Sequence, residues 1–125
     1  MVQKGVSEAD AYSKIWLVDS KGLIVKNRPK GGINHEKAPF AQVGEPIEDL
    51  LECVKHVKPT ALIGCAAQGR KFNKEILELM TSLNERPIVF ALSNPTVKAE
   101  CTAEEAYNFT DVILEFISQF LLICF

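Results

Sequence analysis

Residues 61-ALIGCAAQGRKF-72 join a short apolar run to a turn bounded by glycines, and a helical pattern follows the turn. Dinucleotide-binding βαβ units use G-x-G-x-x-G at such a junction, where the second glycine lets the backbone approach a pyrophosphate. Here Gly64 and Gly69 hold the outer positions, but Ala66 holds the middle one. The spacing alone therefore favours a tight strand-to-helix turn lined by small residues over a phosphate loop.

Two further apolar runs, 15-IWLVD-19 and 87-PIVFALS-93, are as uninterrupted as 60-TALIGC-65. Strands that are buried on both faces of a parallel sheet have this composition. Amphipathic or capped segments alternate with the runs, and they predict helices over 46–57, 73–85 and 102–109, with a shorter helix opened by Ser7 and Asp10. Asn73 is the predicted cap of the second helix, and Thr102 and Glu105 have the spacing of a capping box in the third. The order predicts an α/β fold with a partial doubly wound (Rossmann-like) parallel sheet and crossover helices.

Two features predict that this chain is incomplete. Three clear strands are few for a doubly wound sheet, and the chain closes on the apolar run 112-VILEFISQFLLICF-125. That run is too short to span a membrane as a helix, so a final buried strand or core helix is the favoured interpretation.

The composition is that of an ordinary globular protein, with 47% hydrophobic and 24% charged residues among 125. A net charge of −2 gives no reason to expect a nucleic acid or an anionic membrane as partner. The four cysteines are widely spaced without a C-x-x-C pair, which argues against a zinc site and a disulfide scaffold. The first ten residues lack the apolar run of a secretory signal, so a reducing compartment is expected.

Ligands of open α/β sheets bind outside the carboxyl ends of the strands, which singles out three places. Asp19 closes the first run, and it would either grip ribose hydroxyls or lie solvated in a turn. The loop from Gly64 to Gly69 closes the second run. Asn94 follows the third, and its amide could bind a carboxamide or carboxylate or serve only the turn before Pro95.

Several donors in and after the Asp19 turn could hold a 2′-phosphate, although a solvated basic loop is the simpler interpretation. They are Ser20, Lys21, Lys26, Arg28, Lys30 and Lys37. Most of them lie in the polar connection 26–46, which is rich in glycine and proline. Connections of this length without regular structure are often functional.

Three stretches resemble the nicotinamide-binding domain of the malic enzymes: 14-KIWLVDSKGLIVKNR-28, 57-VKPTALIGCAAQG-69 and 84-NERPIVFALSNPTVKAECTAEEAY-107. The similarity covers roughly residues 2 to 111. The resemblance therefore implies a partial NAD(P)-binding domain over residues 1–111, truncated at both ends, and a divergent apolar tail over residues 112–125. Malic enzymes oxidise malate with NAD or NADP and a divalent metal, Mg or Mn, and decarboxylate the product to pyruvate. The resemblance therefore implies an oxidoreductase whose partners are a nicotinamide dinucleotide and malate or pyruvate.

The resemblance also implies roles for individual residues. It places Asp19 near the adenosine ribose, and it gives Ser20 and Lys37 the pattern of members that prefer NADP. It makes the turn quoted first a loop alongside the cofactor, through Gly64, Cys65, Ala66 and Ala67. Asn94 matches an asparagine near the nicotinamide and the malate, as a cofactor-binding and substrate-binding residue.

The family's phosphate loop, metal-binding carboxylates, catalytic tyrosine and catalytic lysine lie upstream of the matched segment. No catalytic or metal-binding residue is therefore expected in this chain, and we expect it to be inactive alone. The alternative is a non-catalytic nucleotide-binding or subunit-interaction fragment that forms a homo-oligomer with full-length subunits. The resemblance to the cytosolic type implies a cytoplasmic location, with a mitochondrial one as the alternative.

Overall fold

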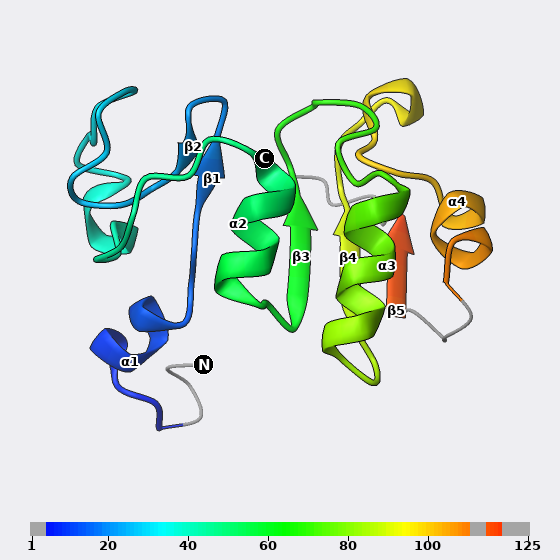
Figure 1. The fold of residues 1–125 in the computed structure, drawn as a ribbon, viewed down its shortest axis with the longest axis horizontal. Coiled ribbons are helices and arrows are strands. Elements are labelled where there is room, and N and C mark those ends of the chain that lie inside the picture. The colour runs from blue at the N-terminus through cyan, green and yellow to red at the C-terminus, as the bar shows by residue number, and fades with distance from the viewer. Residues whose placement is uncertain (1–4, 111–114, 119–125) are drawn as a thin grey trace. The chain divides into compact units, whose positions relative to one another are not determined.

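Figure 1 shows the computed structural model of the chain, in which residues 5–110 and 115–118 are described. The chain divides into two compact units, Met1–Cys53 and Val54–Phe125, and each is taken here by itself. None of the helices in the described ranges is long and apolar enough to cross a membrane.

The first unit holds α1 (Glu8–Ser13), the two-stranded sheet of β1 (Val18–Asp19) and β2 (Gly22–Leu23), and the 3-10 turn η2 (Ala38–Phe40). The helix predicted from Ser7 and Asp10 is confirmed, because the Ser7 hydroxyl accepts the Asp10 N–H at 3.1 Å. The core of this unit includes Leu23, Ile24 and Val25, and Ala11 and Ala41 are also buried.

The run 15–19 differs from its prediction as a strand of the parallel sheet. Only Val18 and Asp19 are extended, and they pair antiparallel with Leu23 and Gly22. Gly22 has φ +101°, which a side chain would rarely allow, and a Cβ there would overlap the Ile47 carbonyl. This glycine turns the chain straight back on itself, so the run forms a short hairpin.

The connection 26–46 is compact, because its two ends are held together. Val25 and Gln42 form an isolated parallel bridge, and the Lys26 N–H donates to the Gln42 carbonyl at 2.9 Å. The Gln42 side-chain amide donates to the carbonyls of Tyr12 and Ile15 at 2.8 and 3.0 Å. The Tyr12 ring meets Phe40 edge to face at 5.0 Å, which fixes η2 against α1.

Helix α2 (Leu50–Val57) begins four residues later than the predicted start at Pro46. Asp49 is the better cap, since its carboxylate accepts the Glu52 N–H at 3.0 Å. Ile47 is also unavailable to the helix, because its carbonyl accepts the Leu23 N–H at 2.7 Å. The predicted end before Pro59 is confirmed.

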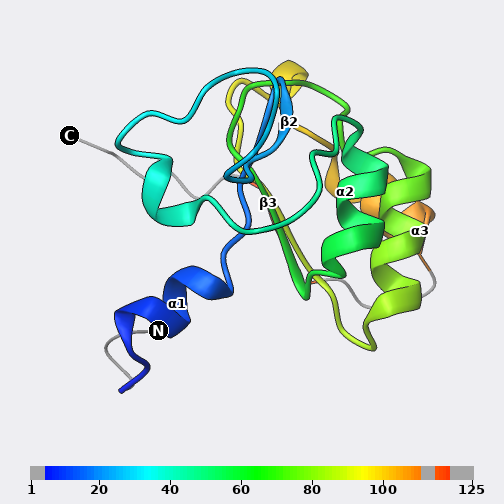
Figure 2. The same ribbon diagram turned by 60° about the vertical axis from the view of Figure 1, so that its left-hand side comes forward.

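The second unit is built on two strand–helix–strand units in series. It contains β3 (Ala61–Gly64), α3 (Lys74–Leu83), β4 (Ile88–Ala91), the 3-10 turn η3 (Thr96–Lys98), α4 (Ala103–Asn108) and β5 (Glu115–Ser118). The strands are parallel in the order β3-β4-β5, and Gly64 and Ser118 flank Ala91 in register. Figures 1 and 2 show α3 lying along one face of this sheet. The predicted parallel sheet with crossover helices is confirmed.

Local sequence accounts for both helices of this unit. The Asn73 side chain caps α3 by accepting the Ile76 N–H at 3.1 Å, and Thr102 and Glu105 form the predicted capping box of α4. The core side of α3 buries Ile76, Leu77 and Met80. In the tail, 115–118 form a strand beside β4, as the strand interpretation expects, while 111–114 and 119–125 lie outside the described residues.

Candidate functional site

The first candidate group surrounds Asp19 at the end of β1. Its Oδ1 accepts the Lys21 backbone N–H and Arg28 Nη1, both at 2.9 Å. Its Oδ2 accepts Arg28 Nη2 at 2.9 Å and Lys37 Nζ at 2.7 Å. Arg28 therefore grips the carboxylate with both arms of its fork, and Lys37 adds a second cation.

These contacts set the electrostatics of the group. The Arg28 guanidinium holds the pKa of the Asp19 carboxyl far below its usual value, against the opposing effect of burial. The Lys37 ammonium and the Lys21 N–H lower this pKa further. Asp19 is thus ionised at neutral pH. It faces two cations, so the group as a whole carries a net positive charge at the strand end.

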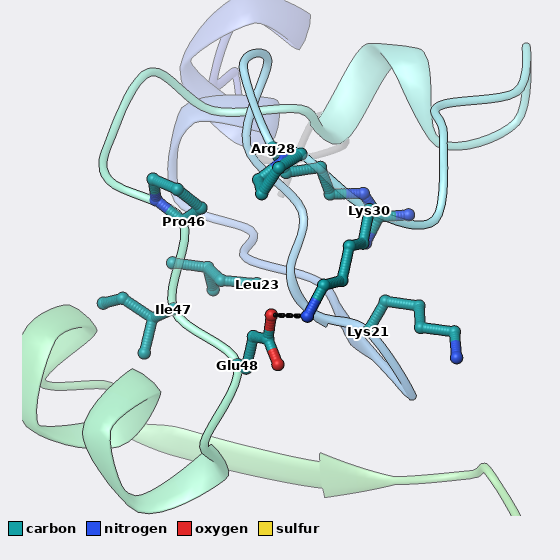
Figure 3. Close-up of a pocket in the computed structure, with 8 residues that line it drawn as sticks. Lys21, Leu23, Arg28, Lys30, Pro46, Ile47 and Glu48 are labelled. Carbon is teal, nitrogen blue, oxygen red and sulfur yellow. Dashed lines mark hydrogen bonds and ion pairs between the residues drawn. The ribbon is translucent and has the colours of Figure 1, made fainter.

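A small hollow lies in the same unit, close to Arg28 (Figure 3). Its walls are Lys21, Leu23, Arg28, Pro29, Lys30, Pro46, Ile47 and Glu48. Lys30 Nζ reaches Glu48 Oε1 at 2.7 Å across it, and both side chains are mostly exposed. Its volume of about 80 Å³ is well below the roughly 300 Å³ at which ligand pockets begin, so it does not hold a dinucleotide by itself.

The second candidate group lies in the other unit, where β3 and β4 end side by side. Leu92 N–H donates to the Gly64 carbonyl at 2.9 Å, and the Ala67 N–H donates to Ser93 Oγ at 2.8 Å. Cys65, Ala66, Ala67 and Asn94 are all exposed. The structure therefore brings the 64–69 loop and the Ser93–Asn94 turn together. The small side chains of residues 65–67 and the amides of Gln68 and Asn94 are exposed to solvent.

A buried carboxylate supports this loop from beneath. Glu100 is 2% exposed, and its Oε1 accepts the Ser93 hydroxyl at 2.5 Å and the Ala66 N–H at 3.3 Å. Its Oε2 is buried and has no hydrogen-bond partner among residues 5–110. A Cβ on Gly64 would overlap the Glu100 side chain. Gly64 is thus required for the carboxylate beneath the loop, and no approach to a phosphate is needed to explain it.

Three of the residues in these groups have roles that sequence reasoning missed or misread. Arg28 is one of the donors for which the sequence left open a phosphate contact or a solvated loop, but its side chain is paired with Asp19. Ser93 was read only as part of a turn, and Glu100 was not singled out. The one local signal for Glu100 is that it is an acidic residue between two apolar ones, in 99-AEC-101. The Asp19 group and the loop group lie in different units, and each stands as a separate observation.

The cysteines give a direct test of the loop's exposure. Cys65 is exposed, whereas Cys101 is 1% exposed and burial raises its pKa to about 12. Because the thiolate is the reactive form, iodoacetamide at pH 8 should modify Cys65 and leave Cys101 unmodified in the folded chain. Peptide mapping by mass spectrometry reads this out, and urea should make Cys101 reactive. Equal rates at the two sites in the native chain would contradict the geometry.

Comparison with known proteins places these groups in context. Residues 1–117 match the family described as "Malic enzyme, NAD binding domain". The chain is 56% identical over 109 residues to the human protein named "NADP-dependent malic enzyme, mitochondrial", covering 87% of this chain and 18% of that protein. It is 53% identical over 108 residues to "NADP-dependent malic enzyme 1" of Arabidopsis thaliana, covering 86% and 18%. The chain thus spans about a fifth of the length of the curated relatives it matches.

Proposed function

Since this chain belongs to the malic enzyme NAD-binding domain family, we propose that it binds the adenosine end of NADP at Asp19 and lines the cofactor with the 64–67 loop. The observation that carries the proposal is the Asp19 group, in which one carboxylate at a strand end faces two cations. A ribose hydroxyl can donate to Asp19, and a 2′-phosphate suits the positive surplus. The NADP-dependent relatives support this choice over NAD.

The residues present fit this end of the cofactor. Lys37 is one-third exposed, and Ser20 is exposed beside Asp19, so both are open to a phosphate. Cys65, Ala66 and Ala67 are exposed residues with small side chains, which would allow a ring or ribose to lie against the loop. When bound, the nicotinamide accepts a hydride, and Asn94 would orient its carboxamide and the substrate carboxylate.

For the longer protein we propose NADP-dependent oxidative decarboxylation of malate to pyruvate. A divalent metal serves this activity in the family, but no cluster of acidic, histidine or cysteine side chains suited to a metal occurs within residues 5–110 and 115–118. For the 125-residue chain we expect cofactor binding without malate-dependent NADPH formation. We further propose assembly with full-length subunits and a cytoplasmic location, with a mitochondrial location as the alternative.

Titration of the chain with NADPH and NADH tests the binding site. Trp16 is the single tryptophan and lies three residues before Asp19, so its fluorescence should respond to both cofactors and saturate at lower NADPH. Lys37→Gln should weaken NADPH binding about tenfold and NADH binding little, because one charge-assisted phosphate contact is lost. Lys30→Gln is the matched control. It removes one positive charge from the same connection, but the Lys30 ammonium is paired with Glu48 and not with Asp19.

Three outcomes would count against the proposal. Saturation by neither cofactor would remove the binding function from this chain. Equal affinity for NADPH and NADH would remove the 2′-phosphate site. An effect of Lys30→Gln as large as that of Lys37→Gln would show that general positive charge, not the Asp19 group, attracts the phosphate.

A further inference from the structure

The Asp19 carboxylate has no acceptor position left for a ligand. A carboxylate offers about four lone-pair sites, two on each oxygen. The Lys21 N–H and Arg28 Nη1 occupy Oδ1, while Arg28 Nη2 and Lys37 Nζ occupy Oδ2. A ribose hydroxyl can therefore bind Asp19 only when one of these donors moves away.

Arg28 is not the donor that moves. Its side chain is 2% exposed, and its Nε donates to the Gly32 carbonyl at 3.1 Å. Its Nη2 also donates to the carbonyls of Gly31 and Gly32 at 3.0 and 2.6 Å. Both glycines have positive φ, +84° and +54°, and this conformation turns their carbonyls toward the guanidinium. Arg28 is thus fixed by the turn that surrounds it and is closed to an incoming phosphate.

Lys37 is the donor that can exchange. Its side chain is 33% exposed, and its ammonium is a compact charge on a flexible four-carbon stem. Moving it from Asp19 Oδ2 to a phosphate oxygen keeps the ammonium paired with an anion. The same movement frees one acceptor position on Asp19 for a ribose hydroxyl.

After Lys37 moves, the net charge of the remaining Asp19–Arg28 pair determines whether a phosphate can bind next to it. A bare carboxylate would repel a 2′-phosphate bound next to it, and this repulsion is strong where side chains are partly buried. Arg28 stays bidentate on Asp19, so the incoming phosphate meets a neutral pair instead of an anion. Lys37 is then free to contribute its whole charge to the phosphate.

We propose that Arg28 is a specificity-determining, positioning residue, which makes the acid at the strand end compatible with a 2′-phosphate by neutralising it without touching the phosphate. This inference rests on the proposed cofactor site. It assigns Arg28 a role different from that of a phosphate ligand, and the two roles respond differently when Asp19 loses its charge.

Adenosine 2′,5′-bisphosphate and adenosine 5′-monophosphate are the probes, titrated calorimetrically into the 125-residue chain. The wild-type chain should prefer the bisphosphate. Arg28→Met exposes the Asp19 charge and should reduce this preference at least about tenfold, with a smaller change for the monophosphate. Adding Asp19→Asn to Arg28→Met should restore most of the preference, because the repelling charge is gone. A phosphate ligand or a merely structural residue would not be rescued in this way.

Two further variants distinguish a loss of charge from a loss of folding, and circular dichroism checks that every variant is folded. Arg28→Lys keeps the cation and should retain the preference. Asp19→Asn alone leaves the Arg28 charge uncancelled and should increase the preference. The inference is overturned if Arg28→Met keeps the wild-type preference, if Asp19→Asn fails to restore it, or if Asp19→Asn alone lowers it.

The proposed function fails separately from this inference. A wild-type chain that binds neither probe, or that binds both equally, overturns the NADP site and with it the role of Arg28. A wild-type chain that prefers the bisphosphate, combined with a failed rescue, leaves the NADP site intact and overturns the role of Arg28 alone.

Discussion

Replacing Gly64 by alanine is expected to lower the free energy of unfolding by about 4 kcal/mol, through overpacking and the loss of two hydrogen bonds. The new Cβ would overlap the Glu100 side chain, which is 2% exposed and has little room to move. Glu100 would have to leave the Ser93 hydroxyl and the Ala66 N–H, so two hydrogen bonds beneath the loop would break. Urea unfolding followed by far-UV circular dichroism measures the loss.

A double-mutant cycle separates this overlap from a general effect of a larger residue. Glu100→Ala removes the obstructing carboxyl, so Gly64→Ala should cost less in that background, with a coupling of about 1–3 kcal/mol. Cys65→Ala is the neighbouring control, and it should change the free energy of unfolding by less than about 0.5 kcal/mol because Cys65 is exposed. Strict additivity of Gly64→Ala and Glu100→Ala would contradict the packing described here.

Features that depend on near neighbours in the sequence were predicted correctly. The caps at Ser7, Asn73 and Thr102 are all observed, because a cap needs only a side chain and an N–H three residues away. The strands at 61–64 and 88–91 are observed for a similar reason, since each apolar run is bounded by its own turns. Local pattern is sufficient where the deciding contact is local.

The predictions of secondary structure that were wrong concern segments whose conformation is set by a contact distant in the sequence. The run 15–19 has the composition of a buried strand, but the turn at Gly22 and the Ile47 carbonyl, 25 residues further on, make it a hairpin. Pro46 resembles a helix start, but the Ile47 carbonyl is already engaged by the Leu23 N–H. A local sequence pattern does not show which distant backbone N–H will donate a hydrogen bond to a given carbonyl.

The candidate site shows the same division. The rule that ligands bind at the carboxyl ends of parallel strands singled out Asp19, the 64–67 loop and Asn94. The structure places the loop and the Ser93–Asn94 turn together at the ends of β3 and β4, whereas Asp19 ends a strand of an antiparallel hairpin in the other unit. The hydrogen-bond partners of those residues could not be predicted from the sequence. A basic connection has the same composition whether its arginine side chain faces solvent or a carboxylate. Arg28 and Glu100 could only be assigned once the structure showed what each contacts.

The second large effect is expected from Asp19→Ala, which should destabilise the first unit by about 3 kcal/mol because the buried Arg28 loses its counter-ion. Lys37 and the Lys21 N–H lose the same acceptor. Trp16 fluorescence during urea unfolding reports on this unit directly. Glu48→Gln is the matched control, since it breaks an ion pair that is mostly exposed at both ends and should leave the midpoint unchanged.

The pH dependence of this loss identifies its cause as ionic. The folded-state pKa of Asp19 is lowered from its ordinary value of 3.8, so the folded chain holds the carboxylate ionised after the unfolded chain has become protonated. The stabilisation by Asp19 is therefore complete above about pH 5 and is lost as the pH falls below about 4. The difference between wild type and Asp19→Ala should be constant from pH 5 to pH 8 and shrink below that window. A difference that persists unchanged at about pH 2 would show that Asp19 stabilises the turn by packing alone, and the ionic clamp on Arg28 would then be wrong.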